Sequence, residues 1–249
     1  VATPNGNKAA TVDSGFNSTN TVASLTINGY SGTITLETIL TVTGAYNQSS
    51  GTLTAGANNV TVGSFTQSGG TFNASSGNLT ISSTFNRTTS TFNHNNGTVT
   101  FLATNNSSYN ITTGGVTFYN LTFNRSASDI FEGTLTLMDS FTVANDLTVQ
   151  NNNSDTGYCI IKGSGSPTIT VSGNLNFPST ASTAGVKLGD YINNFTVNLA
   201  GNFTMTDSSA YMYAHLTFNG TGAQTISQSA GTITGGTWTI NKSADTATL

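Results

Sequence analysis

An internal repeat with a period of about 20 residues constrains the fold of this chain more than any other feature. Residues 45–63, 64–83 and 84–101 superpose, so that apolar residues recur at equivalent positions. A fixed period of this length indicates a repeat architecture in which each unit packs on its neighbours. The four columns are Tyr46, Phe65 and Phe85; Leu53, Phe72 and Phe92; Val60, Leu79 and Val99; and Val62, Ile81 and Phe101. We expect one more unit upstream to extend these columns, in the same order, with Ile27, Ile34, Leu40 and Val42.

A longer period, of about 28 residues, follows in the second half of the chain. Segments with the pattern of FTVANDLTV align there without a gap. The expected columns are Phe141, Ile169 and Val197; Leu147, Leu175 and Phe203; and Ile160, Leu188 and Leu216.

Polar residues recur with the same longer spacing. Asp146, Asn174 and Asn202 each stand just before an inward apolar position, so we expect them to form a polar stack at one corner. Lys162 and Asp190 are expected to pair between adjacent units, although an exposed ion pair contributes only about 0 to 1 kcal/mol.

Each unit contains two or three short segments of the form apolar-Thr-apolar, separated by Gly, Asn and Ser. Alternation with period 2 directs the apolar residues to one face of a strand and Thr to the other. A unit of about 20 residues cannot bury its apolar face alone, whereas stacked units form a continuous core. The sequence therefore predicts an all-β parallel β-solenoid (β-helix) with coils of about 19–28 residues. The alternative is an array of β-sandwich domains, whose repeat is nearer about 100 residues.

The two periods divide the chain into three parts. We expect residues 1–23 to be a cap or a strand-donating arm, residues 24–101 to form coils of about 19–20 residues, and residues 102–249 to form coils of about 22–28 residues. The sequence stops in mid-pattern. This predicts either a piece of a longer solenoid or subunits that stack head to tail on unpaired strand edges.

The composition excludes several classes of protein. Thr, Asn, Ser and Gly make up more than half of the chain, and charged residues are 6 %, against about 25 % in ordinary soluble domains. Six Lys and Arg residues cannot supply the basic surface of a nucleic-acid-binding protein. No apolar run approaches the roughly 18 residues of a membrane-spanning helix. The single cysteine, Cys159, excludes an internal disulfide framework and is expected to be an inert packed thiol.

Residues with catalytic or metal-binding chemistry are sparse. His94 and His215 are far apart, and HExxH and CxxC spacings are missing, so we expect no metal and no cofactor. The most acidic stretch, residues 129–155, contains Asp139 and Asp146, and a polysaccharide-degrading β-helix enzyme that uses them is one alternative. We interpret these acids as solubilising groups and expect a protein that is not an enzyme.

The sequence also contains 17 Asn-x-Ser/Thr motifs, of which six are Asn-apolar-Thr motifs that the strand pattern generates by itself. N-glycosylation is therefore a hypothesis that turn-like surroundings support at some positions. The candidate sites are Asn17, Asn47, Asn73, Asn86, Asn96, Asn106, Asn124, Asn152, Asn219 and Asn241.

The unit SFTQSGGTFNASSGNLTI at residues 64–81 and the segment GGVTFYNLTFN at residues 114–124 resemble the repeats of large prokaryotic surface proteins of the adhesin and autotransporter-passenger type. The resemblance covers most of residues 24–249 and concerns the architecture, so no catalytic residue is carried over. It implies an exported protein that forms rods at the cell surface.

We therefore expect an extracellular structural rod, a subunit or segment of a cell-surface fibre that associates with itself. One alternative is an adhesin that binds glycans or cell surfaces through its lateral surface, where Tyr109, Tyr119, Tyr211 and Tyr213 would supply aromatic rings. Another is an ice-binding solenoid, because outward Thr-x-Thr pairs would form flat arrays.

Overall fold

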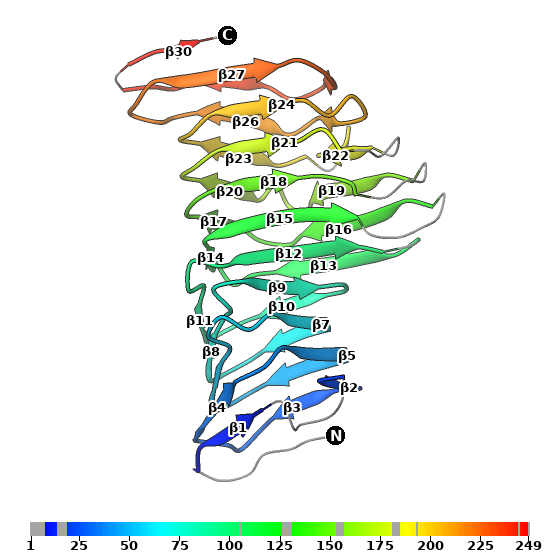
Figure 1. Ribbon diagram of the computed structural model, residues 1–249. Helices are drawn as coiled ribbons and strands as arrows, with labels where there is room; N and C mark the ends of the chain where they lie inside the picture. Colours follow the sequence, from blue (N-terminus) through cyan, green and yellow to red (C-terminus); the bar gives the residue numbers. More distant parts are fainter. Residues whose placement is uncertain are drawn as a thin grey trace.

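The computed structural model is an all-β protein wound as a parallel β-solenoid of about ten coils (Figure 1). It describes residues 8–13, 19–104, 106–125, 131–152, 157–180, 185–192, 194–243 and 245–248. Strands pair in parallel with strands of the adjacent coils. The predicted solenoid is therefore confirmed, and the β-sandwich alternative is wrong because sandwich sheets are antiparallel.

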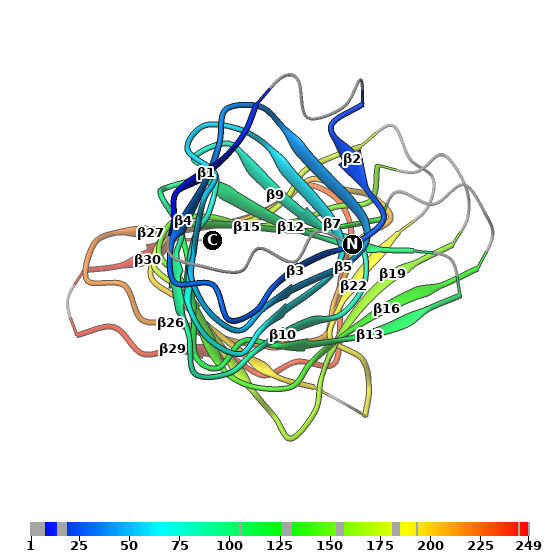
Figure 2. The same cartoon turned by 90° about the horizontal axis from the view of Figure 1, so that it is seen from below.

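Each coil contributes strands to three faces, which are seen nearly end-on in Figure 2. Face 1 consists of β2 (Thr21–Val22), the first parts of β5 (Leu40–Gln48) and β7 (Val60–Gln67), β9 (Asn78–Ile81), β12 (Thr98–Ala103), β15 (Asn120–Arg125), β18 (Leu147–Val149), β21 (Leu175–Phe177), β24 (Phe203–Met205), β27 (Gln224–Gln228) and β30 (Ala247–Thr248). Face 2 consists of β3 (Leu25–Ile27), the second parts of β5 and β7, β10 (Phe85–Arg87), β13 (Ser108–Thr112), β16 (Gly133–Leu137), β19 (Cys159–Gly163), β22 (Val186–Leu188), β25 (Tyr211–Met212) and β28 (Thr232–Ile233).

Face 3 is divided into two stacks along the rod. The first stack contains β1 (Ala10–Val12), β4 (Thr33–Leu36), β6 (Thr52–Thr54), β8 (Thr71–Asn73) and β11 (Thr91–Asn93). The second contains β14 (Thr117–Phe118), β17 (Phe141–Val143), β20 (Thr168–Val171), β23 (Thr196–Leu199), β26 (His215–Phe218) and β29 (Trp238–Ile240). Because β11 and β14 belong to different sheets, face 3 is interrupted where the two stacks meet.

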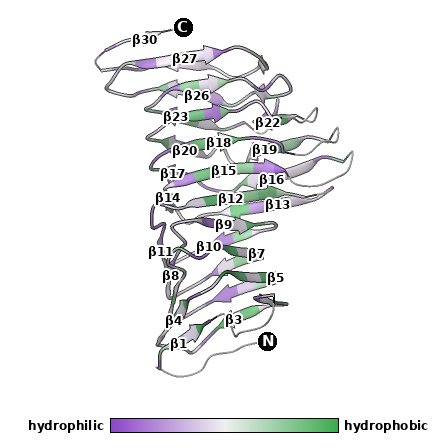
Figure 3. Cartoon of the chain, in the orientation of Figure 1, coloured by the Kyte–Doolittle hydropathy of each residue, from purple (hydrophilic) through white to green (hydrophobic). Residues whose placement is uncertain are grey.

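Alternating side chains explain why these segments form strands. In β16, for example, Leu135 and Leu137 are buried while Thr134 and Thr136 are partly exposed. Hydrophobic and hydrophilic bands therefore alternate along the strands (Figure 3). The β-branched Thr suits an extended backbone and keeps the outer surface polar.

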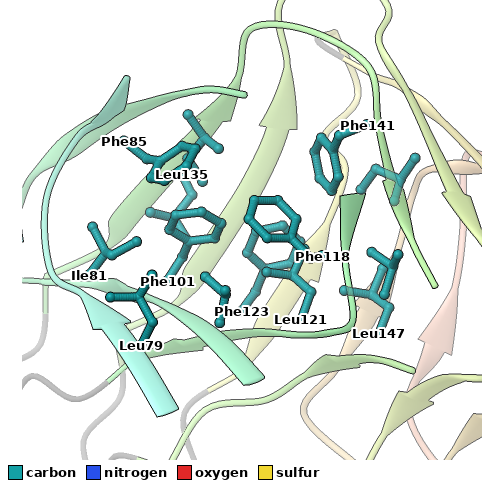
Figure 4. Packing of buried hydrophobic residues seen from close by; sticks show 14 of the residues in the cluster. Leu79, Ile81, Phe85, Phe101, Phe118, Leu121, Phe123, Leu135, Phe141 and Leu147 are labelled. Atoms are coloured by element: carbon teal, nitrogen blue, oxygen red, sulfur yellow. The ribbon is translucent and has the colours of Figure 1, made fainter. Parts of the chain in front are cut away.

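The buried aromatic rings stack along the rod axis. Tyr46 lies over Phe65, and Phe65 over Phe85, with ring centroids 5.0 Å apart in each pair. A separate column on face 1 places Phe101 over Phe123, with ring centroids 6.0 Å apart. Figure 4 shows Phe85, Phe101, Phe118 and Phe123 directed into one continuous core.

The strand registers confirm the columns predicted for residues 45–101 and the two columns that begin at Phe141 and Leu147. The expected position of Ile27 is wrong, because Leu25 pairs with Tyr46 and Ile27 with Gln48. Residues two apart in a strand point to the same side, so the alternating pattern does not distinguish Leu25 from Ile27.

The prediction that Ile160, Leu188 and Leu216 form one column is also wrong. Ile160 points outward and pairs with Lys187, whereas Leu188 pairs with Ile161. Leu216 instead pairs with Val197, on face 3. Changes in corner length shift the register here, so equal spacing in the sequence does not mean equal position in the coil.

The first part of the chain belongs to the same stack. β1 pairs with β4 and β2 pairs with β5, so the described portions of residues 1–23 form strands against this chain's own coils. At the corner between faces 1 and 2 the backbones approach closely. A Cβ atom on Gly63 would lie 2.6 Å from the carbonyl oxygen of Gly44 in the adjacent coil, so this corner requires glycine.

Candidate binding surfaces

The interruption of face 3 forms a groove with a volume of about 870 Å³. We call it the junction groove. Its lining consists of residues 92–96 at the end of the first stack, residues 115–117 at the start of the second, Arg87 at the end of β10, and Gly56 and Ser76 from earlier coils. Phe92 belongs to the lining, and its ring packs edge-on against the buried Phe118, with ring centroids 5.8 Å apart.

Arg87 is fixed at one end of the junction groove. Its Nη1 donates to the carbonyl oxygens of Thr113 and Gly114 at 3.0 and 3.2 Å, and its Nη2 donates to Ser90. The Asp139 carboxylate of the next coil holds the same loop by accepting the backbone N–H of Thr113 and of Gly114, at 2.8 and 2.7 Å. Burial lowers the pKa of Arg87, and the negative charge of Asp139 opposes this shift. The loop is therefore held from both sides.

Aromatic rings gather at a second site, on face 2, which we call the tyrosine patch: Tyr158, Tyr191, Tyr211 and Tyr213. The Tyr191 and Tyr213 ring centroids are 4.7 Å apart, and those of Tyr211 and Tyr213 are 6.2 Å apart. Burial raises the pKa of Tyr213 to about 12, and a hydrogen bond with Tyr191 adds to this shift. The Tyr213 hydroxyl therefore keeps its proton at neutral pH.

Charged groups surround the tyrosine patch. The Lys187 ammonium lies 3.9 Å from the centre of the Tyr158 ring and 3.3 Å from a carboxylate oxygen of Glu132. Lys162 and Asp190 line a pocket of about 320 Å³ with Tyr191 and Tyr213. Tyr191 is 77 % exposed and its neighbour Ile192 is 88 % exposed. The patch thus offers one open ring beside two cations and two carboxylates.

The structure brings together only two of the four tyrosines expected to form a lateral aromatic surface, namely Tyr211 and Tyr213. Tyr119 stacks instead on His94, with ring centroids 5.5 Å apart, and Tyr109 forms a hydrogen bond with Thr104. The prediction that these four tyrosines form a single lateral surface is therefore wrong. The sequence pattern missed Tyr158 and Tyr191 because they lie in corners of unequal length.

The expected polar stack is confirmed. Asp146 Oδ1 accepts the backbone N–H of Asn174 at 2.7 Å, and Asn174 Oδ1 accepts that of Asn202 at 2.9 Å. The stack continues at both ends, since Asn120 Oδ1 accepts from Asn145 and Asn202 Oδ1 accepts from Thr225.

Both acids considered for catalysis therefore have structural partners. Asp139 holds the Thr113–Gly114 loop and Asp146 belongs to the stack. Among the described residues, three or more His, Cys, Asp and Glu side chains do not gather at any one point.

Cys159 is fully buried, and burial raises the pKa of its thiol to about 12. The Arg125 side chain near it is also fully buried and donates to the carbonyl oxygens of Phe131 and Gly157. Arg125 follows Leu121 and Phe123 with period 2 in β15, so the alternation places it inward, but a charged residue type does not by itself indicate burial.

The glycosylation candidates differ in accessibility. Asn17 lies outside the described residues. Three side chains, those of Asn47, Asn73 and Asn124, are partly buried. The exposed candidates are Asn86, Asn96, Asn106, Asn152, Asn219 and Asn241.

These features define the class of the molecule: a repeat protein built as a three-faced parallel β-solenoid. Comparisons of the chain with protein-family models, with curated proteins and with solved structures give no match. The described residues include no helix with the length and apolar character needed to cross a membrane.

Proposed function

We propose that this chain is an extracellular, non-catalytic structural rod, a segment of a cell-surface fibre. One observation carries the proposal: strands of face 1 stack in parallel from β2 to β30 without interruption. Because adjacent strands lie about 4.8 Å apart, such a stack is about 50 Å long. Length in this architecture grows with the number of coils, as a spacer requires.

The lateral surface and the repeats support the same role. Outward positions carry mainly Thr, Asn and Ser, which are hydrated without introducing charge. The two candidate catalytic acids, Asp139 and Asp146, have structural hydrogen-bond partners. The resemblance of the repeats to those of large prokaryotic surface proteins supports a position outside the cell.

Labelling of cells from the source with an antibody against this chain tests the location. We expect intact cells to be labelled, and an antibody against a cytosolic protein to label only permeabilised cells. Labelling by the first antibody that also requires permeabilisation would contradict an extracellular rod.

Self-association is the form of assembly that we propose. Strands β28 and β29 each pair on one side only among the described residues, and Ile240 of β29 is 60 % exposed. Such edges can pair in parallel with a further coil of the same geometry. Negative-stain images of the purified chain are expected to show end-to-end particles, and monodisperse single rods at high concentration would count against this assembly.

A glycan-binding adhesin is the second candidate, because the tyrosine patch combines the exposed Tyr191 ring with Lys162 and Asp190 in one pocket. Aromatic rings pack on the apolar faces of sugars, and charged groups bond to hydroxyls. Glycan-array binding that is lost in Tyr191→Ala and Tyr211→Ala but kept in Thr61→Ala, an exposed position on face 1, would favour this function. Equal glycan binding by all three variants would exclude the tyrosine patch as the glycan-binding site.

A further inference from the structure

A ladder of side-chain hydrogen bonds runs along the outside of face 3 and ends at the junction groove. Asn73 Nδ2 donates to Thr54 Oγ1 at 3.0 Å, and Asn93 Nδ2 donates to Asn73 Oδ1 at 2.7 Å. Each amide thus donates toward the preceding coil and offers its oxygen to the next. No described residue donates to Asn93 Oδ1, because β14 does not pair with β11. The last acceptor of the ladder therefore lies at the groove.

The corner beside Asn93 adds a second acceptor and a donor. Asn95 Nδ2 donates to the carbonyl oxygen of Ala74 at 2.7 Å, which leaves Asn95 Oδ1 as an acceptor. His94 Nδ1 accepts the backbone N–H of Asn96 at 3.0 Å. The neutral imidazole then carries its proton on Nε2, which is a donor. Stacking on Tyr119 fixes the plane of this ring.

Arg87 supplies a further donor at the other end of the groove. Its Nη1 and Nη2 are held by backbone carbonyls, and Nη2 has a second N–H besides the one that Ser90 accepts, whereas its Nε is shielded from solvent. The lining of the groove therefore includes both hydrogen-bond donors and hydrogen-bond acceptors that this chain's own contacts hold in place.

The charges around the junction groove favour a ligand that is itself uncharged. The Arg87 guanidinium would repel a cation in the groove. An anion would be repelled by the amide oxygens of Asn93 and Asn95 and by the negative charge of Asp139, which offsets the charge of Arg87. A hydroxyl group both donates and accepts, so it fits donors and acceptors alike. Phe92 and Val116 in the lining offer an apolar surface to the C–H face of a sugar ring. Ligand sites commonly have volumes of roughly 300 to 1,000 Å³.

From these observations we infer that the junction groove is a binding site for a neutral saccharide. Asn93 and Asn95 accept hydrogen bonds from its hydroxyls, and Arg87 and His94 donate to them. The site is separate from the tyrosine patch and does not depend on the proposed assembly into a fibre.

A glycan array that carries neutral glucose, galactose and mannose oligosaccharides beside uronate, sialylated and amino-sugar counterparts tests the inference. The full chain is expected to bind one or more neutral members. The tightest neutral oligosaccharide then serves as the probe in titration calorimetry. Binding confined to charged members, or no binding to any neutral member at millimolar concentration, would overturn the inference.

Three variants test the groove itself. Asn93→Ala removes an exposed acceptor, His94→Phe keeps the ring on Tyr119 but removes its N–H, and Arg87→Gln removes the cation. Since a neutral hydrogen bond contributes about 0.5–1.5 kcal/mol, Asn93→Ala and His94→Phe should each weaken binding by about 3- to 10-fold. Arg87→Gln should weaken it at least as much.

Matched controls separate binding from folding. Thr170→Ala changes an exposed residue of β20 on the same face, outside the groove, and Tyr191→Ala changes the tyrosine patch. Thr170→Ala should bind the probe as the unchanged chain does, and Tyr191→Ala distinguishes the groove from the patch. If Asn93→Ala and His94→Phe keep the melting temperature and also bind with unchanged affinity, the groove is not the site. Loss of binding in Tyr191→Ala alone would assign the saccharide to the patch.

Discussion

The side chain of Phe65 shows how one residue holds adjacent coils together. It is fully buried, stacks on the rings of Tyr46 and Phe85, and meets Phe72 edge-on at 5.0 Å. Aromatic pairs of this geometry contribute about 0.5–1.5 kcal/mol beyond the burial of their area. Each ring is thus shared between three coils.

Phe65→Ala should therefore destabilise the rod by about 3–5 kcal/mol, because it leaves a cavity in the middle of the column. Thr61→Ala, at an exposed position of the same strand, should change the stability by no more than about 0.5 kcal/mol. Urea denaturation followed by circular dichroism measures both. Equal midpoints for the two variants would show that the aromatic column does not support the fold.

Cys159 provides a test of burial that depends on pH. Its thiol has a pKa raised to about 12 by burial, whereas an unfolded thiol ionises near pH 8.5. Iodoacetamide at pH 8.5 should leave the folded chain unmodified and alkylate it in urea, as read by intact mass. Because the folded form keeps its proton, its stability should fall as the pH rises above about 8.5. Rapid alkylation of the folded chain would contradict a packed thiol.

The glycosylation hypothesis is decided by the mass of the native material. We expect added hexose-containing mass on exposed motifs such as Asn86 and Asn219, and none on the partly buried Asn73, whose amide bonds to Thr54. Peptide mapping after deglycosylation identifies the sites. A mass equal to that of the bare polypeptide would remove the hypothesis.

Inward apolar residues could be predicted from the sequence because both the alternation and the period identify them. Inward polar residues could not. Gln48, Gln67 and Arg87 occupy equivalent positions in successive coils, where Gln48 Nε2 donates to the carbonyl oxygen of Thr71 and Gln67 Nε2 to that of Thr91. The alternation places these residues inward, two positions after Tyr46, Phe65 and Phe85, but their polar side chains do not indicate burial until their backbone partners in the next coil are known.

At the scale of the elements, corners determine the register. The corner stack that passes through Asp146, Asn174 and Asn202 was predictable because the longer units align there without a gap. The junction groove was not predictable, because it arises where the coil length changes. Phe85 pairs with Ile111 on face 2 and Val99 pairs with Leu121 on face 1, so the chain between partners is longer on face 2. The change of period near residue 101 predicts longer coils, but it does not show that face 3 is interrupted there.

Asp146→Ala tests the corner stack. It removes the acceptor for the backbone N–H and the Nδ2 of Asn174, so it should cost about 1–3 kcal/mol. Asp146→Asn keeps an acceptor oxygen and should lose much less. The two denaturation midpoints are compared directly. If both variants are as stable as the unchanged chain, the hydrogen bonds of the corner stack do not contribute to the stability of the fold.

At the scale of the whole molecule, the chain forms one rod whose cross-section changes along its length. The first coils are small, whereas β13, β16 and β19 extend beyond their outline (Figure 2). The junction groove lies where the two stacks of face 3 meet, and the tyrosine patch lies on the wider coils. Binding surfaces thus appear where the repeat departs from regularity, while the regular coils supply the length.

The vertical register between coils is the central claim, and paired cysteines measure it most directly. Thr61 and Thr80 are register partners on the outside of face 1, whereas Ser82 is two residues farther along the chain. In a Cys159→Ala background, the pair Thr61→Cys and Thr80→Cys should form a disulfide on mild oxidation. The pair Thr61→Cys and Ser82→Cys should not, because Cα atoms more than about 7 Å apart cannot be bridged. Cross-linking of the second pair instead of the first would contradict the register on which the rod and its surfaces depend.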